Sequence, residues 1–542
     1  MRRARTPVQG RSDAQRTKES AGGNRSWSLS RIELSNCGIG YQMPTSEFTE
    51  EFFSRSPHSA LIALRWRHQS VTYGQLHNLA ERFASRLGDG DLPPSGPVMV
   101  TGFKAPSTIA LMLALQLVGR SVLVPSSALG EQALIELASR VDCECLATPA
   151  APLLMDGDAL ALRRIGRRRQ SGNPLSAPAR LLFTTSGSTG APKVVLTDPA
   201  GINTFLAWAA EQFELTESTP VLSFAPLNFD LSLLDIWATL RVGGCSVLVD
   251  ADHSADGHYL LDLLAEENPR LIQAVPMFFR LLDLVDPQRR IAFGAVQHVV
   301  STGDALTGRL AEGIHHRFPQ ARIYNVYGCT ETNDSFIHEL QFGMSSSDHD
   351  GPVPIGRPIA GVEAEVRDTK DRAIRGPGHG ELYVATPFQA TNYLNSPEDE
   401  AEKFAQPNPG APPYYRTGDL VTVSEDGTFA LFGRVDFLVK VRGVRINLQE
   451  VEHVLNSHLD VLESVVLTHQ DELAGQLLTC CIRRRPGSRL NSLRLRSYCG
   501  DRLERAAIPS VVHIIDQPLP RNPNGKIDRD LVRINLKEGT VA

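Results

Sequence analysis

Apolar and polar residues follow one another along most of the chain in the manner of an α/β protein. Between residues 48 and 125, apolar residues recur every three or four positions in two segments and form short runs between them. This pattern predicts helices over 73–87 and 107–118 and strands over 58–66, 98–100 and 121–125. Helices that alternate with short strands rich in Val and Leu are typical of parallel sheets. We therefore expect a large domain of sheets flanked by helices.

The pattern changes at Gly433-Arg434-Val435-Asp436, which marks a candidate domain boundary. Beyond it, the pattern predicts helices over 449–457 and 489–505 and strands over 461–468 and 476–483. A segment of about 100 residues with this mixed pattern has the usual size of a small α+β domain. The predicted fold class is therefore α/β, with a large domain over 45–433 and a small, mobile C-terminal domain over 434–542.

The first 44 residues are predicted to be a flexible tail. Residues 1–30 are rich in Arg, Ser, Gly and Gln, and no apolar segment follows the arginines as a secretory signal would require. Residues 151–180 contain another group of arginines, between Arg163 and Arg169. This segment is predicted to be a loop whose charged side chains are solvated.

Composition and charge exclude several classes of protein. The 542 residues include 55 Lys and Arg against 61 Asp and Glu, so no global positive field is available to attract nucleic acid. The cysteines include Cys143 with Cys145 and the adjacent Cys480 and Cys481, which lack the spacing of a zinc or redox site. We expect reduced thiols and a cytoplasmic protein. The segment Ile109–Val118 is too short to span a membrane and predicts a buried helix.

A strand that runs into a loop of glycines and hydroxyl residues is the first candidate for chemistry. Residues 181–193 read LLFTTSGSTGAPK. Glycines let backbone N–H groups turn toward an anion, and Ser and Thr hydroxyls add hydrogen-bond donors. The segment is not a P-loop, because Gly190 is followed by Ala191-Pro192 and not by Lys and Ser or Thr. It predicts a phosphate-binding loop of another kind, and a plain turn or linker is the alternative.

The string SGSTGAPK resembles the phosphate loop of the adenylate-forming superfamily, which includes acyl-CoA synthetases, luciferases and the adenylation domains of nonribosomal peptide synthetases. Further segments match that superfamily in the expected order: NVYGCTET at 325–332, YRTGDL at 415–420, GRVDFLVKVRGVRI at 433–446 and NPNGKIDR at 522–529. The matches extend from about residue 45 to about residue 530. Among its members, the chain most resembles free-standing amino-acid adenylation enzymes.

The resemblance implies ATP and Mg²⁺ as cofactors. Glu331 matches the family's metal-binding carboxylate, and Mg²⁺ prefers oxygen ligands. Tyr327 would stack on adenine, and Asp419 would accept both ribose hydroxyls. The resemblance assigns further nucleotide contacts to Thr185, Ser186, Gly187, Ser188, Thr189, Gly190, Lys193, Gly303, Asp304, Ala305, Asn325 and Arg434. Cys329 stands where the family usually has proline.

The resemblance identifies Lys526 and Thr330 as catalytic residues. The Lys526 ammonium can bridge the carboxylate, the ribose and the α-phosphate, whereas a lone Lys after Asn-Gly would be a surface residue in a turn. Thr330 would touch the α-phosphate. Asp436 matches the hinge about which the small domain rotates after the adenylate has formed. Gly443, which has no side chain, would then let a narrow channel form for the incoming thiol.

The acid that is activated is predicted to be an amino acid. Residues 226–237, PLNFDLSLLDIW, resemble the peptide-synthetase subgroup, in which the residue at Asp230 receives the substrate ammonium. Capping of a helix is the alternative role of this carboxylate. The other substrate-binding positions implied by the resemblance are Leu231, Leu234, Gln273, Val300, Thr302, Val326, Asp334 and Ser335. Asp334 would favour a polar or cationic side chain, although the same segment resembles enzymes that load proline.

These observations predict a free-standing, AMP-forming ligase of natural-product biosynthesis. It would transfer an activated amino acid to the phosphopantetheine thiol of a separate carrier protein, because the 13 residues after NGKIDR cannot hold a carrier domain. No nucleic-acid or membrane partner is expected. An acid–CoA ligase is the first alternative and should accept acids that lack the amine. The second is a degenerate, non-catalytic ATP-binding protein, which the joint presence of Lys526, Glu331 and Asp419 disfavours.

Overall fold

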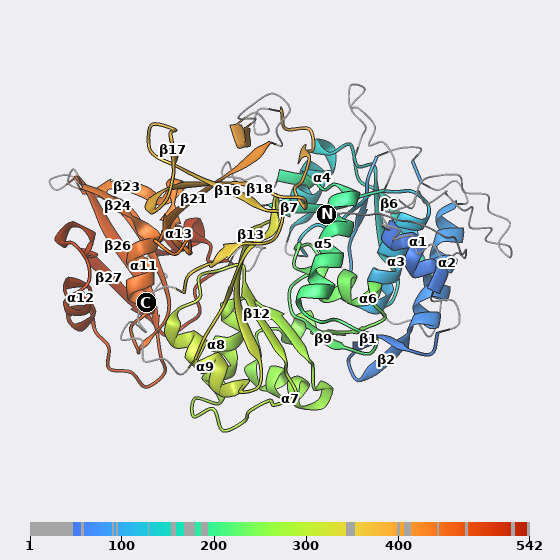
Figure 1. Cartoon of the computed structure of the whole chain (residues 1–542), viewed down its shortest axis with the longest axis horizontal. Helices are drawn as coiled ribbons and strands as arrows, with labels where there is room; N and C mark the ends of the chain where they lie inside the picture. The colour runs from blue at the N-terminus through green and yellow to red at the C-terminus, as the bar shows by residue number, and fades with distance from the viewer. Residues whose placement is uncertain are drawn as a thin grey trace, which may run out of the picture. The chain divides into compact units, whose positions relative to one another are not determined.

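The predicted alternation of helices and short strands produces two large sheets, each with a run of parallel strands at its centre (Figure 1). The computed structural model of the chain describes residues 47–55, 59–88, 92–93, 96–127, 129–152, 159–166, 179–185, 193–342, 353–397, 402–405, 413–441, 444–471, 475–521 and 526–538. The predicted tail over 1–44 lies outside these described residues.

The larger sheet carries much of the candidate site. Its strands in spatial order are β15 (Arg357–Pro358), β14 (Asn333–Glu339), β13 (Arg322–Cys329), β12 (His298–Thr302), β11 (Leu271–Ala274), β9 (Pro220–Ser223), β10 (Cys245–Leu248), β1 (Ile62–Trp66) and β2 (Gln69–Thr72). The strands from β13 to β1 pair in parallel, as the sequence pattern predicted. Their carboxyl ends therefore meet at one edge of the sheet.

The second sheet leads into the predicted phosphate loop. Its strands in order are β19 (Asn392–Tyr393), β8 (Lys193–Leu196), β7 (Leu181–Thr185), β4 (Val122–Leu123), β3 (Val98–Val100), β5 (Cys145–Pro149) and β6 (Leu160–Arg164). Parallel pairing runs from β7 to β5. Strands β7 and β8 pair in an antiparallel manner on either side of the loop, with Thr185 opposite Lys193.

Helices cover these sheets and bury their apolar faces. The helices of the large domain are α1 (Glu47–Arg55), α2 (Tyr73–Gly88), α3 (Pro106–Leu117), α4 (Glu131–Arg140), α5 (Pro199–Gln212), α6 (Thr239–Arg241), α7 (Gly257–Glu267), α8 (Pro276–Val285) and α9 (Gly308–Arg317). The predictions over 73–87 and 107–118 correspond to α2 and α3 and are confirmed. Helix α3 is buried on almost every side, as its uninterrupted apolar sequence predicts. Among the described helices, none is long and apolar enough to cross a membrane.

A third sheet connects the large domain to the small one. It contains β17 (Ala373–Ile374), β16 (Glu363–Arg367), β18 (Gly378–Ala385), β21 (Tyr414–Val423) and β20 (Phe404–Ala405), with β22 (Phe429–Arg434) paired to β21. The small domain follows with β23 (Leu438–Val441), β24 (Val444–Asn447), α11 (Leu448–Asn456), β25 (Val461–Asp471), β26 (Gly475–Arg484), α12 (Ser492–Gly500), β27 (Val511–Ile515) and α13 (Arg529–Glu538). The strands predicted over 461–468 and 476–483 are confirmed as β25 and β26.

Two predicted elements differ from the structure. The segment 151–180 is not a continuous loop, because β6 forms within it and pairs with β5; alternate side chains Leu160 and Leu162 pack on the core, which the arginines nearby concealed. Arg163 is exposed, as predicted, and forms a surface ion pair with Glu131. The helix predicted over 489–505 is shorter, because Asn491 caps α12 at its start and the chain leaves the helix after Gly500.

Gly433 lies where β22 meets the start of the small domain, and it packs directly against Asn447. Asn447 is buried and caps α11 by accepting a hydrogen bond from the backbone N–H of Gln449 at 2.9 Å. Its side-chain amide also donates to the carbonyl of Arg434 at 3.3 Å. A Cβ atom at Gly433 would lie 1.8 Å from the Asn447 amide nitrogen. Glycine is therefore required here by a close approach.

We predict that Gly433→Ala lowers the apparent free energy of unfolding by about 1–2 kcal/mol, because Asn447 would have to leave its capping position. Urea unfolding of the whole chain, followed by tryptophan fluorescence, measures the effect. The control is Gly294→Ala, at a glycine where the added Cβ would meet no atom within 4 Å. In an Asn447→Ala background the cost of Gly433→Ala should shrink, and strict additivity would contradict the proposed collision.

Candidate active site

Four neighbouring strands deliver side chains to the carboxyl edge of the larger sheet. Strand β9 leads to the turn that carries Asp230, β11 provides Gln273, and β12 provides Thr302. Strand β13 provides Tyr327 and continues into the turn that carries Glu331. Ligands of open parallel sheets bind at this edge, because the loops that leave it converge there. The topology thus brings together segments that are about 100 residues apart in the sequence.

Apolar positions predicted for the acid pocket belong to one packed cluster. Leu234, Val300 and Val326 have 0%, 0% and 3% of their surface exposed and share the core that surrounds Trp237. The Gln273 amide donates to the carbonyl of Leu231 at 2.7 Å, so β11 holds the segment after Asp230. These contacts make one wall of the candidate site rigid and apolar.

Two polar positions of the predicted pocket, Asp334 and Ser335, lie at the start of β14, which pairs with β13. Ser335 is fully buried, and its hydroxyl donates to the carbonyl of Asn333 at 3.1 Å. Asp334 lies opposite Gly328 at a register shift in the strand pair. A Cβ at Gly328 would lie 2.8 Å from the Cα of Asp334, so the two backbones are in close contact.

Asp230 and Asp334 are partly buried carboxylates, and the loss of solvent around them raises the pKa of both. Burial and the charge of Glu331 raise the pKa of Asp230 to about 6, and the Lys526 ammonium acts in the opposite direction. Burial and the charge of Asp230 raise the pKa of Asp334 to about 7. Since charges influence a pKa over short distances, Lys526 from the small domain lies within electrostatic range of Asp230.

Cys329 shows that three predicted site carboxylates converge. Burial raises the pKa of its thiol well above the usual value, and the charges of Glu331, Asp419 and Asp230 add to that increase. Its sulfur lies 3.2 Å from the Thr332 hydroxyl. The thiol of Cys329 is therefore uncharged and lies within electrostatic range of all three carboxylates.

Glu331 has the surroundings expected of a carboxylate that binds a cation. It is 6% exposed, and its Oε1 accepts a hydrogen bond from the Tyr393 hydroxyl at 2.6 Å. The Tyr393 hydroxyl also lies 3.0 Å from that of Tyr415. Among the described residues, none donates to Oε2. The site thus offers one carboxylate oxygen for a metal, in keeping with Mg²⁺ sites completed by substrate phosphates and water.

A closed cage of protein ligands is not present, since the described residues contain no group of three or more acidic, His or Cys side chains that could hold a metal ion. Lys193 stands at the end of the predicted phosphate loop, and its ammonium lies 5.3 Å from the centre of the Tyr393 ring. Since the Tyr393 hydroxyl donates to Glu331, this end of the predicted loop lies near Glu331. Of the predicted loop residues, Ser186, Gly187, Ser188, Thr189 and Gly190 lie outside the described residues, as does Gly443.

Asp419 is held by two hydrogen bonds and keeps capacity for more. Its Oδ2 accepts from the Tyr327 hydroxyl at 2.5 Å, and its Oδ1 accepts from Arg434 at 2.6 Å. A carboxylate oxygen can accept a second hydrogen bond, so one position remains on each oxygen. This geometry suits a vicinal diol. The Tyr327 ring is 8% exposed and packs edge-on against Phe336.

Arg434 also bridges toward the predicted hinge. Its Nη2 donates to Asp436 at 3.3 Å. Burial lowers the pKa of Arg434, but the charges of Asp419 and Asp436 outweigh burial and raise this pKa overall. Asp436 lies in a short 3₁₀ turn, Val435–Phe437. The nucleotide-site carboxylate and the hinge carboxylate therefore share one guanidinium.

Several predicted residues make contacts that the sequence did not reveal. The Asn325 amide donates to the carbonyls of Val353 and Pro354, at 3.1 and 2.9 Å. Gly303 has φ +81°, and the exposed Asp304 accepts a hydrogen bond from the N–H of Ala305 at 2.8 Å. Thr330 is partly buried in the turn that follows β13.

Tyr393 and Tyr415 were not identified from the sequence. Tyr415 opens the YRTGDL segment, so its place in that motif was a signal that could have drawn attention to it. Its hydroxyl lies 3.0 Å from that of Tyr393. Tyr393 follows a segment without a recognised motif and had no comparable signal. Two arginines at and after the end of β26 are engaged within the small domain: Arg484 pairs with Asp516 at 2.7 Å, and Arg485 donates to the carbonyl of Leu459 at 3.3 Å.

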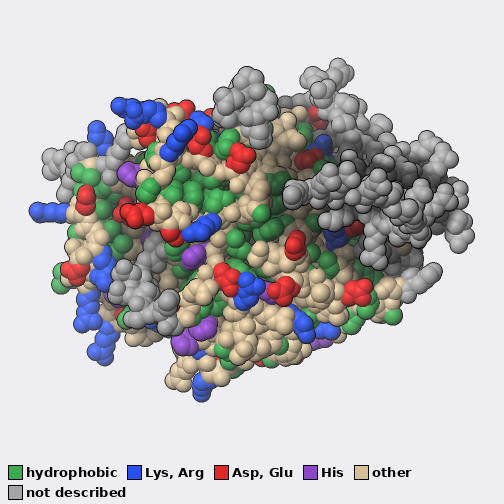
Figure 2. All heavy atoms as spheres, in the orientation of Figure 1, with side chains coloured by type: hydrophobic (Ala, Val, Ile, Leu, Met, Phe, Trp, Pro, Cys, Tyr) green, Lys and Arg blue, Asp and Glu red, His purple; other side chains and the backbone are tan. Residues whose placement is uncertain are grey.

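The surface view shows Lys and Arg side chains gathered on the small domain (Figure 2). Several exposed arginines of this region lie around α12, at Arg489, Arg494, Arg496, Arg502 and Arg505.

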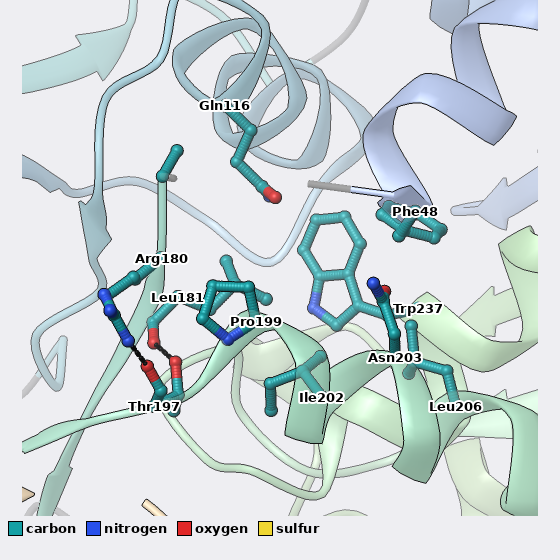
Figure 3. A pocket seen from close by; sticks show the side chains of 11 residues that line it. Phe48, Gln116, Arg180, Leu181, Thr197, Pro199, Ile202, Asn203, Leu206 and Trp237 are labelled. Atoms are coloured by element: carbon teal, nitrogen blue, oxygen red, sulfur yellow. Dashed lines mark hydrogen bonds between the residues drawn. The ribbon is translucent and has the colours of Figure 1, made fainter. Parts of the chain in front are cut away.

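A separate apolar cavity lies between α1, α3 and α5, where Phe48, Gln116 and Trp237 approach one another (Figure 3). The predicted site residues do not line it.

The converging carboxylates place the candidate site at the carboxyl edge of the larger sheet, within electrostatic range of Lys526 in the small domain. Residues 53–394 match the family model of AMP-binding enzymes, and residues 450–526 match the model of the AMP-binding enzyme C-terminal domain. The chain therefore belongs to the AMP-binding enzyme family. The predicted superfamily and fold class are confirmed.

Curated relatives include peptide synthetases and carrier-protein ligases. The chain is 30% identical over 504 residues to a linear gramicidin synthase of Brevibacillus parabrevis, covering 89% of this chain and 9% of that protein. It is 27% identical to a D-alanine–D-alanyl carrier protein ligase of Lacticaseibacillus paracasei, covering 87% of this chain and 95% of the ligase. The chain thus spans about a tenth or less of some synthetases that it matches.

Solved structures show the same fold. Klebsiella oxytoca NpsA in complex with 3-hydroxyanthranilyl-AMSN matches with a TM-score of 0.73 and 24% identity, covering 91% of this chain and 100% of NpsA. The four-domain nonribosomal peptide synthetase AB3403, bound to AMP and glycine, matches with a TM-score of 0.74 and 23% identity, covering 90% of this chain and 37% of AB3403. At these identities the likeness concerns the fold alone.

The raised pKa of Asp334 yields a prediction for stability. A carboxyl whose folded-state pKa exceeds its unfolded value loses stability as pH rises between the two values. Asp334→Asn should therefore stabilise the protein progressively from about pH 4 to about pH 7, by about 1 kcal/mol for each pH unit, and by a constant amount above that. Thermal unfolding at pH 5 and pH 8 measures the difference.

Asp286→Asn is the matched control of opposite sign. Burial raises the pKa of Asp286, but hydrogen bonds from Ile291, Arg290 and Arg317 outweigh it and lower the pKa overall. Its replacement should reduce stability at pH 8. A stabilisation by Asp334→Asn that does not change with pH would contradict the desolvated carboxylate.

Proposed function

We propose that the chain joins the carboxylate of an amino acid to the α-phosphate of ATP and then transfers the aminoacyl group to the phosphopantetheine thiol of a carrier protein. The observation that supports this most directly is the placement of Asp230. Its desolvated carboxylate shares a site with Glu331 and lies within electrostatic range of Lys526. A carboxylate in that position calls for a cationic partner, which the ammonium of an amino acid would supply.

The first step requires positioning and charge neutralisation. A carboxylate oxygen of the acid attacks the α-phosphorus, the bond to the β-phosphate oxygen breaks, and pyrophosphate leaves with its electron pair. Both reactants are anions, so donors aimed at the developing charge supply most of the rate enhancement. Lys526 and Thr330 would hold the α-phosphate, while Asp419 would fix the ribose. Mg²⁺, bound through Glu331, would neutralise phosphate charge.

The second step uses the small domain differently. Rotation about Asp436 would withdraw Lys526 and present the segment around Gly443 to the thiol of the carrier. The thiolate sulfur attacks the acyl carbon, and AMP leaves. A carrier-protein ligase is among the relatives that the chain matches along nearly their whole length, which supports a separate carrier as the acceptor.

The placement of Asp230 also distinguishes the two enzyme classes considered. A ligase for fatty or aryl acids has no use for a desolvated carboxylate in the acid site, because it would remain unpaired when the substrate binds. Asp334 adds a second carboxylate beside Asp230 and favours an amino acid with a further polar or cationic group. A screen of pyrophosphate exchange over proteinogenic and diamino acids identifies the substrate.

We predict that Lys526→Ala lowers amino-acid-dependent pyrophosphate exchange by about 10²–10³-fold, because one cationic donor to the reacting phosphate is lost. Lys537→Ala, an exposed lysine on α13, is the matched control and should retain full exchange. Near-normal exchange by the Lys526 variant would remove this residue from the chemistry.

We predict that Asp230→Asn lowers kcat/KM for the best amino acid by about 10²-fold, since the ammonium loses its charged acceptor. Exchange with the corresponding deaminated acid should change little. The control is Asp198→Asn, because Asp198 caps α5 and Asn caps helices equally well. A wild-type enzyme that activates the deaminated acid and joins it to free CoA would favour the acid–CoA ligase.

A further inference from the structure

Two buried glutamates of the small domain contact the chain on either side of Lys526. Glu463 in β25 is 4% exposed, and Glu452 in α11 is 9% exposed. Neither residue belongs to the predicted site. Buried carboxylates are costly unless they are paired and hydrogen-bonded, so their partners indicate what they hold in place.

Glu463 binds the segment that enters the Lys526 loop. One carboxylate oxygen accepts a hydrogen bond from the backbone N–H of Leu519 at 3.0 Å. The other accepts from the guanidinium of Arg521 at 2.9 Å. Leu519 itself is 2% exposed and packs with Val465 and other residues in a local core. Backbone and side chain on the entering side are therefore both tied to one carboxylate.

Glu452 binds the segment that leaves the loop. Its Oε2 accepts from the guanidinium of Arg529 at 2.6 Å, and its Oε1 accepts from the backbone N–H of Val466, also at 2.6 Å. Arg529 donates further to the carbonyl of Val466 at 2.9 Å. Its guanidinium stacks 4.4 Å above the ring of Phe437. The leaving side is thus fixed to β25 as well.

The two sides of the loop meet at its base, next to Lys526. Arg521 and Ile527 form an isolated antiparallel bridge, and the N–H of Asp528 donates to the carbonyl of Pro520 at 2.8 Å. Lys526 directly precedes the bridged residue Ile527 and is exposed. The position of its backbone is consequently set by the bridge and by the carboxylates on both sides.

We propose that Glu463 and Glu452 are positioning residues for Lys526, which fix both ends of its loop so that the ammonium reaches the reacting phosphate at one place. The proposal rests on the proposed function, because it assumes that Lys526 acts in adenylation. Misplacement of a catalytic group by about 1 Å can cost about 10²-fold in rate. A long, flexible side chain such as lysine depends especially on a fixed backbone origin.

The two half-reactions separate a positioning role from a structural one. Glu463→Gln and Glu452→Gln keep the volume of the side chain but remove the charge that holds each arginine. In the full-length enzyme, each should lower kcat for pyrophosphate exchange by about 10- to 100-fold, with KM for ATP nearly unchanged. Transfer from synthetic aminoacyl-AMP to free pantetheine should stay close to wild type, because that step does not use Lys526.

Glu450→Gln is the matched control, since Glu450 lies on the same helix as Glu452 and is exposed. It should leave both half-reactions unchanged. Equal losses in the two half-reactions would show a merely structural role and overturn the proposal, as would full exchange by both variants. Lys526→Ala serves as the reference for a selective loss of exchange.

Amide hydrogen exchange tests the anchoring without reference to activity. In Glu463→Gln, the amides of 519–521 and 526–530 should exchange at least about 10-fold faster, while those of β26 keep their protection. Unchanged protection around the loop would contradict the proposal even in an active enzyme. A wild-type chain that exchanges pyrophosphate with no acid would instead contradict the proposed function, and the anchoring would still be decided by these amides.

Discussion

Concentrated acidic charge at the carboxyl edge of the larger sheet is the constraint around which this molecule is organised. The charges of Asp230, Glu331 and Asp419 all raise the pKa of the Cys329 thiol, and the charge of Asp230 raises the pKa of Asp334. Such a concentration of carboxylates in a desolvated place is unfavourable unless cations are brought to it. Lys526 approaches from the small domain, Arg434 is bound to Asp419, and Lys193 stands beside Tyr393.

Each carboxylate is held differently, and the differences suit different ligands. Asp419 is fixed by Tyr327 and Arg434 and retains one acceptor position on each oxygen, which matches a diol. Glu331 receives a single tyrosine hydroxyl on one oxygen. Desolvation is the main cause of the raised pKa values of Asp230 and Asp334. A cationic partner would therefore stabilise the charged forms of these two carboxylates most. Burial and hydrogen bonding thereby give the carboxylates of one acidic edge different surroundings, as the proposed sites for ribose, metal and amine would require.

Contacts of arginine side chains connect the large domain with the small domain and its hinge region. Arg434 contacts both Asp419 and Asp436, so the nucleotide site and the hinge are linked through one side chain. Arg280 of α8 donates to the carbonyl of Leu462, beside Glu463, at 3.3 Å. Glu463 in turn holds Arg521 and Leu519. A chain of buried polar contacts thus extends from the large domain to the base of the Lys526 loop.

The sequence by itself determined the family, the parallel sheets and the residues expected to touch ATP, because motifs and the period of apolar residues are local in the chain. It also placed α2, α3, β25 and β26 close to their observed bounds. It missed β6, since two leucines among arginines give a weak strand signal, and it missed Tyr393, Glu452 and Glu463. Only the tertiary structure decided those roles, because the burial of a carboxylate and the identity of its partner depend on residues tens of positions away.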